Sequence, residues 1–365
     1  MARSFLNGMH VDIGIRVENV VSFELALPYF KYNQAQTAIF YRDLLDRLNH
    51  APGIDSAAAT TTLPMTGGMQ GSAFRLDDSP KPPNWRDEMV VYNASTPGYF
   101  ATMGIPVLRG RDFNAQDTAA SVPVGIVNEA LVRQYFLGQD PIGRRYLDDY
   151  DGKWRTIIGV VGSVAHQKPT EPPMPGVYAP ASQWLPDWMW IVLRSRGGTG
   201  PVIATARQVV RQLDPNLPIE KVRTMRQVIS DSLQIPRLLM EVLGVFAVFA
   251  LLLDAIGIYG IVDYSVRQRT HEMGIRIALG ASCGAVARLM ARKGIVPAAV
   301  GAVIGLPVAI ASLGVLRAVL FGVTPHDATV AIGVSALLFI VAVGASLVPA
   351  RRAARVDAVV ALRYE

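Results

Sequence analysis

Apolar residues run almost without interruption through three long windows near the C-terminal end of the chain. Residues 294–316 and 329–349 carry no charged side chain, and residues 242–262 carry one, Asp254. A helix needs about 20 apolar residues to cross a bilayer, and charge-free runs longer than about 18 residues are rare in soluble domains. The pattern therefore predicts three transmembrane helices rather than three buried helices of a soluble core.

The first 237 residues show a different pattern, in which short strand-like runs alternate with amphipathic helices. A strand is predicted at 20–27 and a helix at 34–48, where apolar residues recur near the 3.6-residue period. Further strands are predicted at 56–63, 89–94, 122–128, 156–164 and 189–194, and further helices at 129–136, 201–213 and 225–233. The stretches 64–87 and 166–188 are rich in proline, glycine and aspartate and are predicted to be long loops.

Composition agrees with this division of the chain. Of the 365 residues, 51% are hydrophobic and 18% are charged, whereas a typical soluble protein has roughly 25% charged residues. This balance argues against a single soluble domain and against a disordered chain. Together with the strand–helix–strand order, it predicts an α+β domain over residues 1–237, followed by an all-α membrane domain of three transmembrane helices over residues 238–365.

The net charge of +6 distinguishes the two sides of the predicted membrane domain. Between long apolar runs, a basic excess favours membrane topology over nucleic-acid binding. Loop 265–293 holds six basic residues and the tail after residue 349 holds four, whereas loop 317–328 holds one. By the positive-inside rule, loop 265–293 and the C-terminal tail are cytoplasmic and residues 1–237 are extracytoplasmic.

The sequence carries no catalytic or metal-binding pattern. It has no G-x-x-x-x-G-K-S/T phosphate loop and no G-x-S-x-G nucleophile turn, and its five histidines lack metal-ligand spacing. The single cysteine, Cys283, rules out an intrachain disulfide. We therefore predict a chain that is not an enzyme and has no catalytic residue, bound cofactor or bound metal.

The start of the sequence differs from what export of a large domain requires. The first ten residues have no apolar core and no cleavage pattern, so they do not form a signal peptide. No segment before residue 238 is apolar enough to start export. Three explanations stay open: the chain is a fragment, its start is misassigned, or another polypeptide supplies a preceding span.

The strongest local motif lies in the first predicted cytoplasmic loop, over residues 267–281. Glu272 precedes Arg276 by four residues, the favourable order for a helical ion pair that contributes about 0.2–0.5 kcal/mol. Ile275 and Leu279 offer apolar contacts, and Gly280 can end the helix. From the residues alone, this helix docks on a cytosolic partner or lies in the lipid headgroup layer.

This loop also resembles a known family. The segment RTHEMGIRIALGA at 269–281 resembles the signature of the FtsX-like/MacB-like ABC transporter permeases, and the tail 349–365 resembles their C-terminal end. Five further segments resemble the MacB-like periplasmic core: TPGYFATMGIP at 96–106, GRDF at 110–113, VNEA at 127–130, DPIGRR at 140–145 and IGVVG at 158–162. The chain is most similar to a C-terminal half-unit of the acidobacterial-type duplicated permeases, without its first transmembrane helix.

The resemblance implies a multi-pass permease subunit of the bacterial inner membrane. A separate cytoplasmic ABC ATPase subunit binds and hydrolyses ATP, and the resulting motion reaches the extracytoplasmic domain to export or extract a substrate. Further implied partners are a second permease half or a second copy of the chain, and membrane lipid. The implied ATPase-coupling positions are Arg269, Glu272, Gly274, Ile275, Arg276, Leu279 and Gly280. Their alternative role is to hold the loop helix together.

Three positions call for separate comment. Asp254 lies in mid-span, where the family usually has a small apolar residue; a membrane carboxylate costs about 2.5–3.5 kcal/mol on insertion scales. It faces a partner helix, is protonated, or marks a decaying gene. Gly301 and Gly305 are spaced to let another helix pack closely, or are simply lipid-facing.

Two other functions compete with the transporter. One is a signalling mechanotransmitter that regulates a cell-envelope hydrolase and moves no substrate. The other is a truncated, non-functional remnant, suggested by the missing helix and by Asp254. The large MacB-like outer domain favours the exporter.

Overall fold

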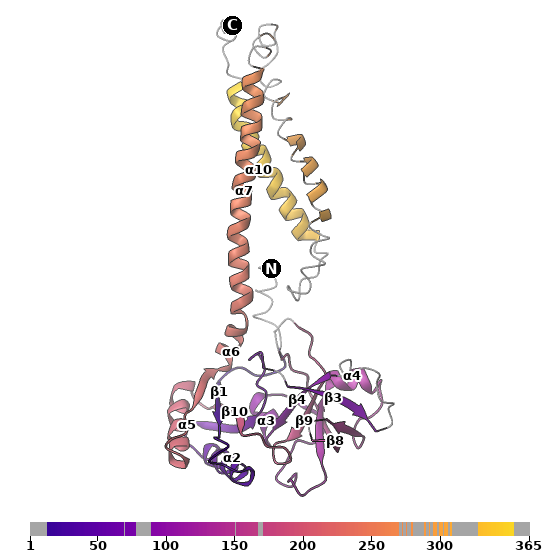
Figure 1. The fold of residues 1–365 in the computed structure, drawn as a ribbon, viewed down its shortest axis with the longest axis vertical. Helices are drawn as coiled ribbons and strands as arrows, with labels where there is room; N and C mark the ends of the chain where they lie inside the picture. The colour runs from indigo at the N-terminus through magenta and orange to yellow at the C-terminus, as the bar shows by residue number, and fades with distance from the viewer. Residues whose placement is uncertain are drawn as a thin grey trace. The chain divides into compact units, whose positions relative to one another are not determined.

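The computed structural model describes residues 13–68, 70–77, 89–149, 151–166, 171–269 and 328–353, together with scattered positions between 272 and 308. The chain divides into two compact units (Figure 1). The N-terminal unit extends to Ile235, and the C-terminal unit begins at Pro236.

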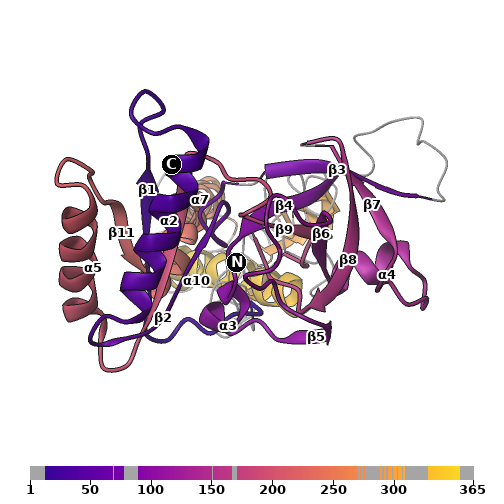
Figure 2. The same ribbon diagram turned by 90° about the horizontal axis from the view of Figure 1, so that it is seen from below.

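A four-stranded antiparallel sheet forms one part of the N-terminal unit. Its strands are β1 (Val20–Ala26), β2 (Ile54–Thr60), β10 (Trp188–Ser195) and β11 (Glu220–Thr224), in the order β11-β1-β10-β2. Two helices connect them: α2 (Gln34–Asn49) lies between β1 and β2, and α5 (Thr199–Leu213) lies between β10 and β11. The element order is that of the split β-α-β fold, and α2 and α5 lie side by side (Figure 2).

The sequence of helix α2 explains why this helix forms and packs on the four-stranded sheet. Asn33 begins the helix with a capping box, in which its side chain accepts a hydrogen bond from the Gln36 N–H and the Gln36 side chain accepts one from the Asn33 N–H. Tyr41, Leu44 and Leu48 recur at helical spacing and are buried. They join one apolar core with residues of α5, β1, β2 and β10.

Six strands inserted between β2 and β10 close into a ring. They are β3 (Gln70–Leu76), β4 (Met89–Ser95), β6 (Val124–Asn128), β7 (Arg145–Asp148), β8 (Lys153–Val161) and β9 (Gly176–Pro180). Their pairings run β4-β3-β7-β8-β6-β9 and return to β4. All six contribute to one apolar cluster, which therefore fills the interior of the ring. Closure leaves these strands without a free edge. Two more pairings add to the ring: β5 (Val107–Gly110) pairs with β8, and β2 pairs with β4, which joins the four-stranded sheet to the ring.

Three short helices complete the N-terminal unit. They are α3 (Tyr99–Met103), α4 (Glu129–Tyr135) and α6 (Met225–Ser232). Phe100 of α3 is fully buried in a third cluster, which also includes Val192 of β10 and Ile126 of β6. This cluster packs the four-stranded sheet against the ring.

The C-terminal unit contains two long helices among its described residues. Helix α7 runs over Gln234–Gln268 and α10 over Ala328–Ala353. Helix α7 includes the segment Glu241–Gln268, the one helix of the described residues that is long and apolar enough to cross a membrane. In α10 the described apolar stretch is the shorter Gly333–Pro349. The predicted span 294–316 is described only at scattered positions, so the three-helix membrane domain stays a prediction.

The mixed α/β character predicted for the N-terminal part of the chain is confirmed. The prediction of long loops at 64–87 and 166–188 was wrong in part, because they contain β3 and β9. In β3, Ser72, Phe74 and Leu76 alternate as buried residues, a period of two that glycine-rich flanks obscure. All residues of β9 are buried, so this strand shows no alternation at all.

Candidate functional site

Helix α7 leads into the predicted coupling loop and presents apolar side chains outward. Only 6% of its most apolar 18-residue window is buried. Phe246 is 66% exposed and Leu253 is 69% exposed, whereas Val262 is fully buried. Leucine and phenylalanine in this arrangement are stable only in apolar surroundings, as in a membrane. Asp254 lies exposed within this helix, and no described residue forms an ion pair with it.

The end of α7 is marked by two ion pairs that involve arginine. Arg267 Nε lies 2.9 Å from Asp263 Oδ2 within the last turns of the helix. After the helix ends at Gln268, the Arg269 N–H donates to the Val266 carbonyl at 3.2 Å. Arg269 Nη1 then lies 3.5 Å from Glu272 Oε2. The structure therefore places two predicted coupling residues, Arg269 and Glu272, next to one another.

The predicted apolar contacts of the loop are exposed. Ile275 is helical and 40% exposed, and Leu279 is 83% exposed. The Leu279 N–H donates to the Ile275 carbonyl at 3.0 Å, so the two residues lie one helical turn apart. The predicted positions Gly274, Arg276 and Gly280 lie outside the described residues, and so does the predicted Glu272–Arg276 pair. An exposed apolar pair beside an ion pair has the composition of a small docking surface.

The two glycines predicted to pack another helix lie in open space. Gly301 and Gly305 are helical, and a Cβ atom added at either would meet nothing within 4 Å. Within the described residues, no neighbouring helix uses the close approach that these glycines permit.

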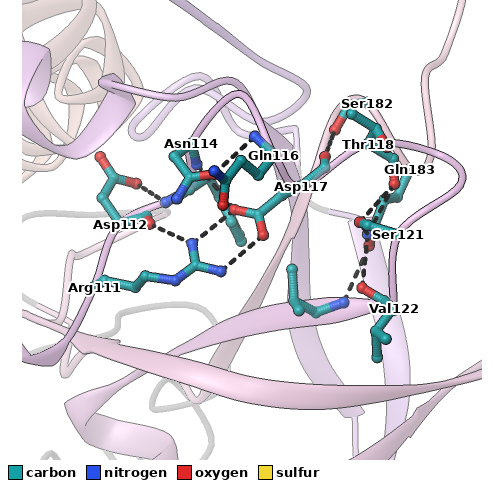
Figure 3. A network of polar contacts seen from close by, with 12 residues as sticks. Arg111, Asp112, Asn114, Gln116, Asp117, Thr118, Ser121, Val122, Ser182 and Gln183 are labelled. Atoms are coloured by element: carbon teal, nitrogen blue, oxygen red, sulfur yellow. Dashed lines mark hydrogen bonds and ion pairs between the residues drawn. The ribbon is translucent and has the colours of Figure 1, made fainter.

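A polar network in the N-terminal unit fixes the segment that follows β5 (Figure 3). Arg111 donates two hydrogen bonds to the Asp117 carboxylate, at 2.7 and 2.8 Å, and the Asn114 N–H donates a third at 2.9 Å. The Arg111 bonds hold the pKa of Asp117 below its usual range. Ser182 Oγ donates to the Asp117 carbonyl, and the Gln183 side chain donates to the Thr118 carbonyl. The network therefore ties this segment to the chain that follows β9.

A buried cation lies inside the six-stranded ring. The Arg155 side chain is fully buried, and its Nε lies 2.7 Å from Asp148 Oδ2, whose side chain is also fully buried. Arg155 Nη2 bonds Asp151 Oδ2 at 2.8 Å, and Nη1 bonds Gln183 Oε1 at 2.9 Å. A fully buried charge requires such partners. Gln183 contacts both Arg155 and the network around Asp117, so it links the two.

Sequence reasoning did not find these two networks. Arg111 stands in the GRDF segment that was noted for its resemblance, but nothing in that segment points to Asp117 six residues later. Arg155 stands at an inward position of β8, where a hydrophobic residue is expected. A charged residue between Trp154 and Ile157 was the available signal, and Asp148, Asp149 and Asp151, which precede it, were the candidate partners.

Comparison with protein families settles what kind of chain carries these features. Residues 10–223 match the MacB-like periplasmic core domain, and residues 244–358 match the FtsX-like permease C-terminal domain. The chain belongs to the FtsX-like/MacB-like family of ABC transporter permeases. Members of this family are integral to the inner membrane and have an extracytoplasmic domain.

Curated relatives of this permease include exporters with different cargoes. The macrolide export ATP-binding/permease protein MacB of an Azoarcus strain is 29% identical over 76% of this chain and 43% of its own length. The pyoverdine export ATP-binding/permease protein PvdT of Pseudomonas syringae pv. tomato is 26% identical over 83% of this chain and 46% of its own length. The uncharacterized ABC transporter permease YknZ of Bacillus subtilis is 23% identical over 75% of this chain and 70% of its own length. The permease thus spans less than half the length of the first two.

Proposed function

We propose that this permease couples ATP hydrolysis by a separate cytoplasmic ABC ATPase to movement of its extracytoplasmic domain, and so exports or extracts a substrate. The observation that supports this most is the match to both family domains along one chain, with the MacB-like core at 10–223 and the FtsX-like domain at 244–358. On this proposal the ATPase binds ATP, and the permease itself binds no cofactor. The permease works with a second permease half or a second copy of itself.

The proposed topology has three transmembrane helices, at about 242–262, 294–316 and 329–349. The outward-facing apolar side chains of α7 support the first of them. The arginines of loop 265–293 and of the tail support a cytoplasmic location for both segments. On this topology, residues 1–237 lie outside the cytoplasm and α7 joins them to the coupling loop without a break.

The coupling surface proposed for the ATPase consists of Glu272, Ile275, Arg276 and Leu279. Leu279 and Ile275 are exposed one turn apart, so both can insert into an apolar cleft of a partner. Glu272 is partly exposed, and its exposed ion pair with Arg269 contributes about 0.2–0.5 kcal/mol. So weak a pair can exchange its partner for a residue of the ATPase at little expense in stability.

The test is reconstitution of the full chain in lipid nanodiscs with a separately purified candidate ABC ATPase from the same organism. We expect the permease to bind the ATPase and to raise its rate of ATP hydrolysis. The double variant Glu272→Ala/Arg276→Ala should lower both at least tenfold. Arg267→Ala is the matched control, because Arg267 pairs within α7, and it should leave both unchanged. Binding and hydrolysis that are equal in the double variant and the unmodified chain would overturn the docking proposal.

The single cysteine gives a direct test of topology. Cys283 lies in the loop proposed to be cytoplasmic. A membrane-impermeant maleimide should label it in inverted membrane vesicles and not in spheroplasts. A Cys283→Ala/Leu137→Cys variant should show the reverse, because Leu137 is 86% exposed in the N-terminal unit. Labelling of Cys283 in sealed spheroplasts would contradict the topology.

A further inference from the structure

The loop between β1 and α2 presents two aromatic side chains to solvent. Tyr29 is 82% exposed and Phe30 is 81% exposed, and their rings meet edge to face with centroids 5.8 Å apart. Within the described part of the N-terminal unit, no other pair of neighbouring aromatic residues is exposed to this degree. Adjacent exposed aromatics are costly to hydrate and are enriched at the centre of protein interfaces.

Hydrogen bonds within the turn and to α5 fix the backbone around Tyr29 and Phe30, which we call the aromatic tip. The Lys31 and Tyr32 N–H groups donate to the Pro28 carbonyl at 2.9 and 3.0 Å, which closes the turn. Lys31 Nζ and the Tyr32 hydroxyl donate to the same Asp214 oxygen, at 2.6 and 2.7 Å. Asp214 is almost fully buried at the C-terminal end of α5. A braced tip loses little conformational entropy on binding, which favours a recognition role.

The exposed face of α5 adjoins this brace and is basic. Arg207 and Arg211 lie one turn apart and are exposed, and Ala204, Gln208 and Gln212 flank them on the same open face of the helix. Helix α5 contains no acidic residue. Among the described residues, neither arginine has a carboxylate partner. Arg211 precedes Asp214 by three residues, about 4.5 Å along the helix axis, so the arginine pair lies on the same end of α5 as the buried residue that anchors the aromatic tip.

We propose that Tyr29 and Phe30, together with Arg207 and Arg211, form one docking surface for a different protein. That partner presents an apolar pocket beside a helix that carries carboxylates four residues apart. Such carboxylates lie about 6 Å apart, the spacing of two arginines one turn apart on α5. The positive charge of the two arginines favours carboxylates on the partner. The exposed aromatic pair favours an apolar pocket on the partner.

A second copy of this chain is a poorer occupant of the same surface. In a two-fold symmetric dimer through this surface, the same patch of both copies meets, so both sides of the interface carry the same net positive charge. Like charges that face each other across an interface are unfavourable. The small Ala204 at the edge of the arginine pair instead lets a partner helix approach the α5 backbone.

The experiment uses the full chain in cells that make it, with a photoreactive benzoylphenylalanine in place of Phe30. We expect a single protein adduct whose yield falls at least tenfold in Arg207→Glu/Arg211→Glu. Lysine substitutions at the crosslinked acidic positions of the partner should restore the yield. The matched control carries the photoreactive residue in place of Leu137, which is equally exposed and apolar, and should give no such adduct. Because both arginines are exposed, the tryptophan fluorescence melt of the charge-reversed variant should match that of the unmodified chain.

Several results would overturn the proposal. They are an adduct of twice the mass of the chain, a lipid adduct, no adduct at all, or a protein adduct that charge reversal leaves unchanged. Because the Glu272→Ala/Arg276→Ala variant tests ATPase docking in a different unit, failure here is distinguishable from failure of the proposed function.

Discussion

The two units of this permease use apolar side chains in opposite ways. In the N-terminal unit, Phe100 and Leu44 are fully buried in clusters between sheet, ring and helices. In α7, Phe246 and Leu253 are more than half exposed. The same residue types therefore imply different surroundings, water for one unit and lipid for the other. A composition of 51% hydrophobic residues averages over both and describes neither.

The two units also differ in how their charged side chains are paired. In the ring of the N-terminal unit, the buried guanidinium of Arg155 is paired with Asp148 and Asp151. In α7, no described residue pairs with Asp254. All five tryptophans lie before residue 236, so tryptophan fluorescence reports the unfolding of the N-terminal unit alone. This allows the two units to be tested separately in one chain.

The largest expected effect is the loss of the buried cation in the ring. Arg155→Ala removes the buried guanidinium that neutralises the buried Asp148 carboxylate, so we expect the free energy of unfolding to fall by about 3–5 kcal/mol. Urea unfolding of the full chain in detergent, followed by tryptophan fluorescence, measures this change. Arg145→Ala is the control, because the Arg145–Asp77 pair is exposed and contributes about 0–1 kcal/mol. Equal effects of the two variants would contradict the role assigned to burial.

The second prediction sets an exposed leucine of one unit against an exposed leucine of the other. Leu253→Lys in α7 should hinder membrane insertion by about 2.5–3.5 kcal/mol. Leu137→Lys, at a position that is 86% exposed in the N-terminal unit, should change stability by less than about 0.5 kcal/mol. The fraction of each variant that resists carbonate extraction from membranes measures the difference. Full membrane retention of Leu253→Lys would show that α7 does not face lipid.

The third prediction concerns acid sensitivity of the network in Figure 3. Hydrogen bonds from Arg111 lower the pKa of Asp117, so the folded state favours the ionised carboxylate. That stabilisation is present above the ordinary aspartate pKa of about 3.9 and is lost as the pH falls through the lowered value. Asp117→Asn should therefore cost about 1–3 kcal/mol at pH 7, and the difference from the unmodified chain should shrink in acid.

Asp112 is the matched control, because burial raises its pKa. Its contribution is fully present below the ordinary aspartate pKa and is lost as the pH rises through the raised value. Relative to Asp112→Asn, the unmodified chain should therefore lose stability as the pH rises. Tryptophan fluorescence melts between pH 3 and pH 7 measure both trends, and parallel trends for the two variants would refute the pKa assignment.

Local elements of the fold were largely predictable, and their closure into a ring was not. The largely apolar, largely buried run of β1 and the capping box of α2 are short-range signals that the sequence displays directly. Ring closure depends on the parallel pairings of β6 with β8 and of β4 with β9. Parallel partners are joined by long connections, and no turn residue specifies which strands meet.

For the candidate site, too, local spacing could be predicted from the sequence, but the specific side-chain contacts could not. The motif at 269–281 located the loop, and helical spacing placed Ile275 and Leu279 one turn apart. The pair between Arg269 and Glu272 was missed because spacings of three and four residues are both allowed on a helix. The Arg111–Asp117 contact lies in an irregular segment, where no periodicity relates the two residues.

The smallest expected effect on stability belongs to the coupling loop itself. Arg269→Ala removes an exposed ion pair, so the free energy of unfolding of the C-terminal unit should change by no more than about 0.5 kcal/mol. Far-ultraviolet circular dichroism during thermal unfolding, which also follows the helices of this unit, should show no shift. If the loop is a docking surface, the same variant still weakens ATPase binding, because Arg269 is itself one of the coupling positions that the family resemblance implies and its positive charge is lost. A large shift in melting would instead show that the pair holds the loop together, and would assign this segment to structure rather than to coupling.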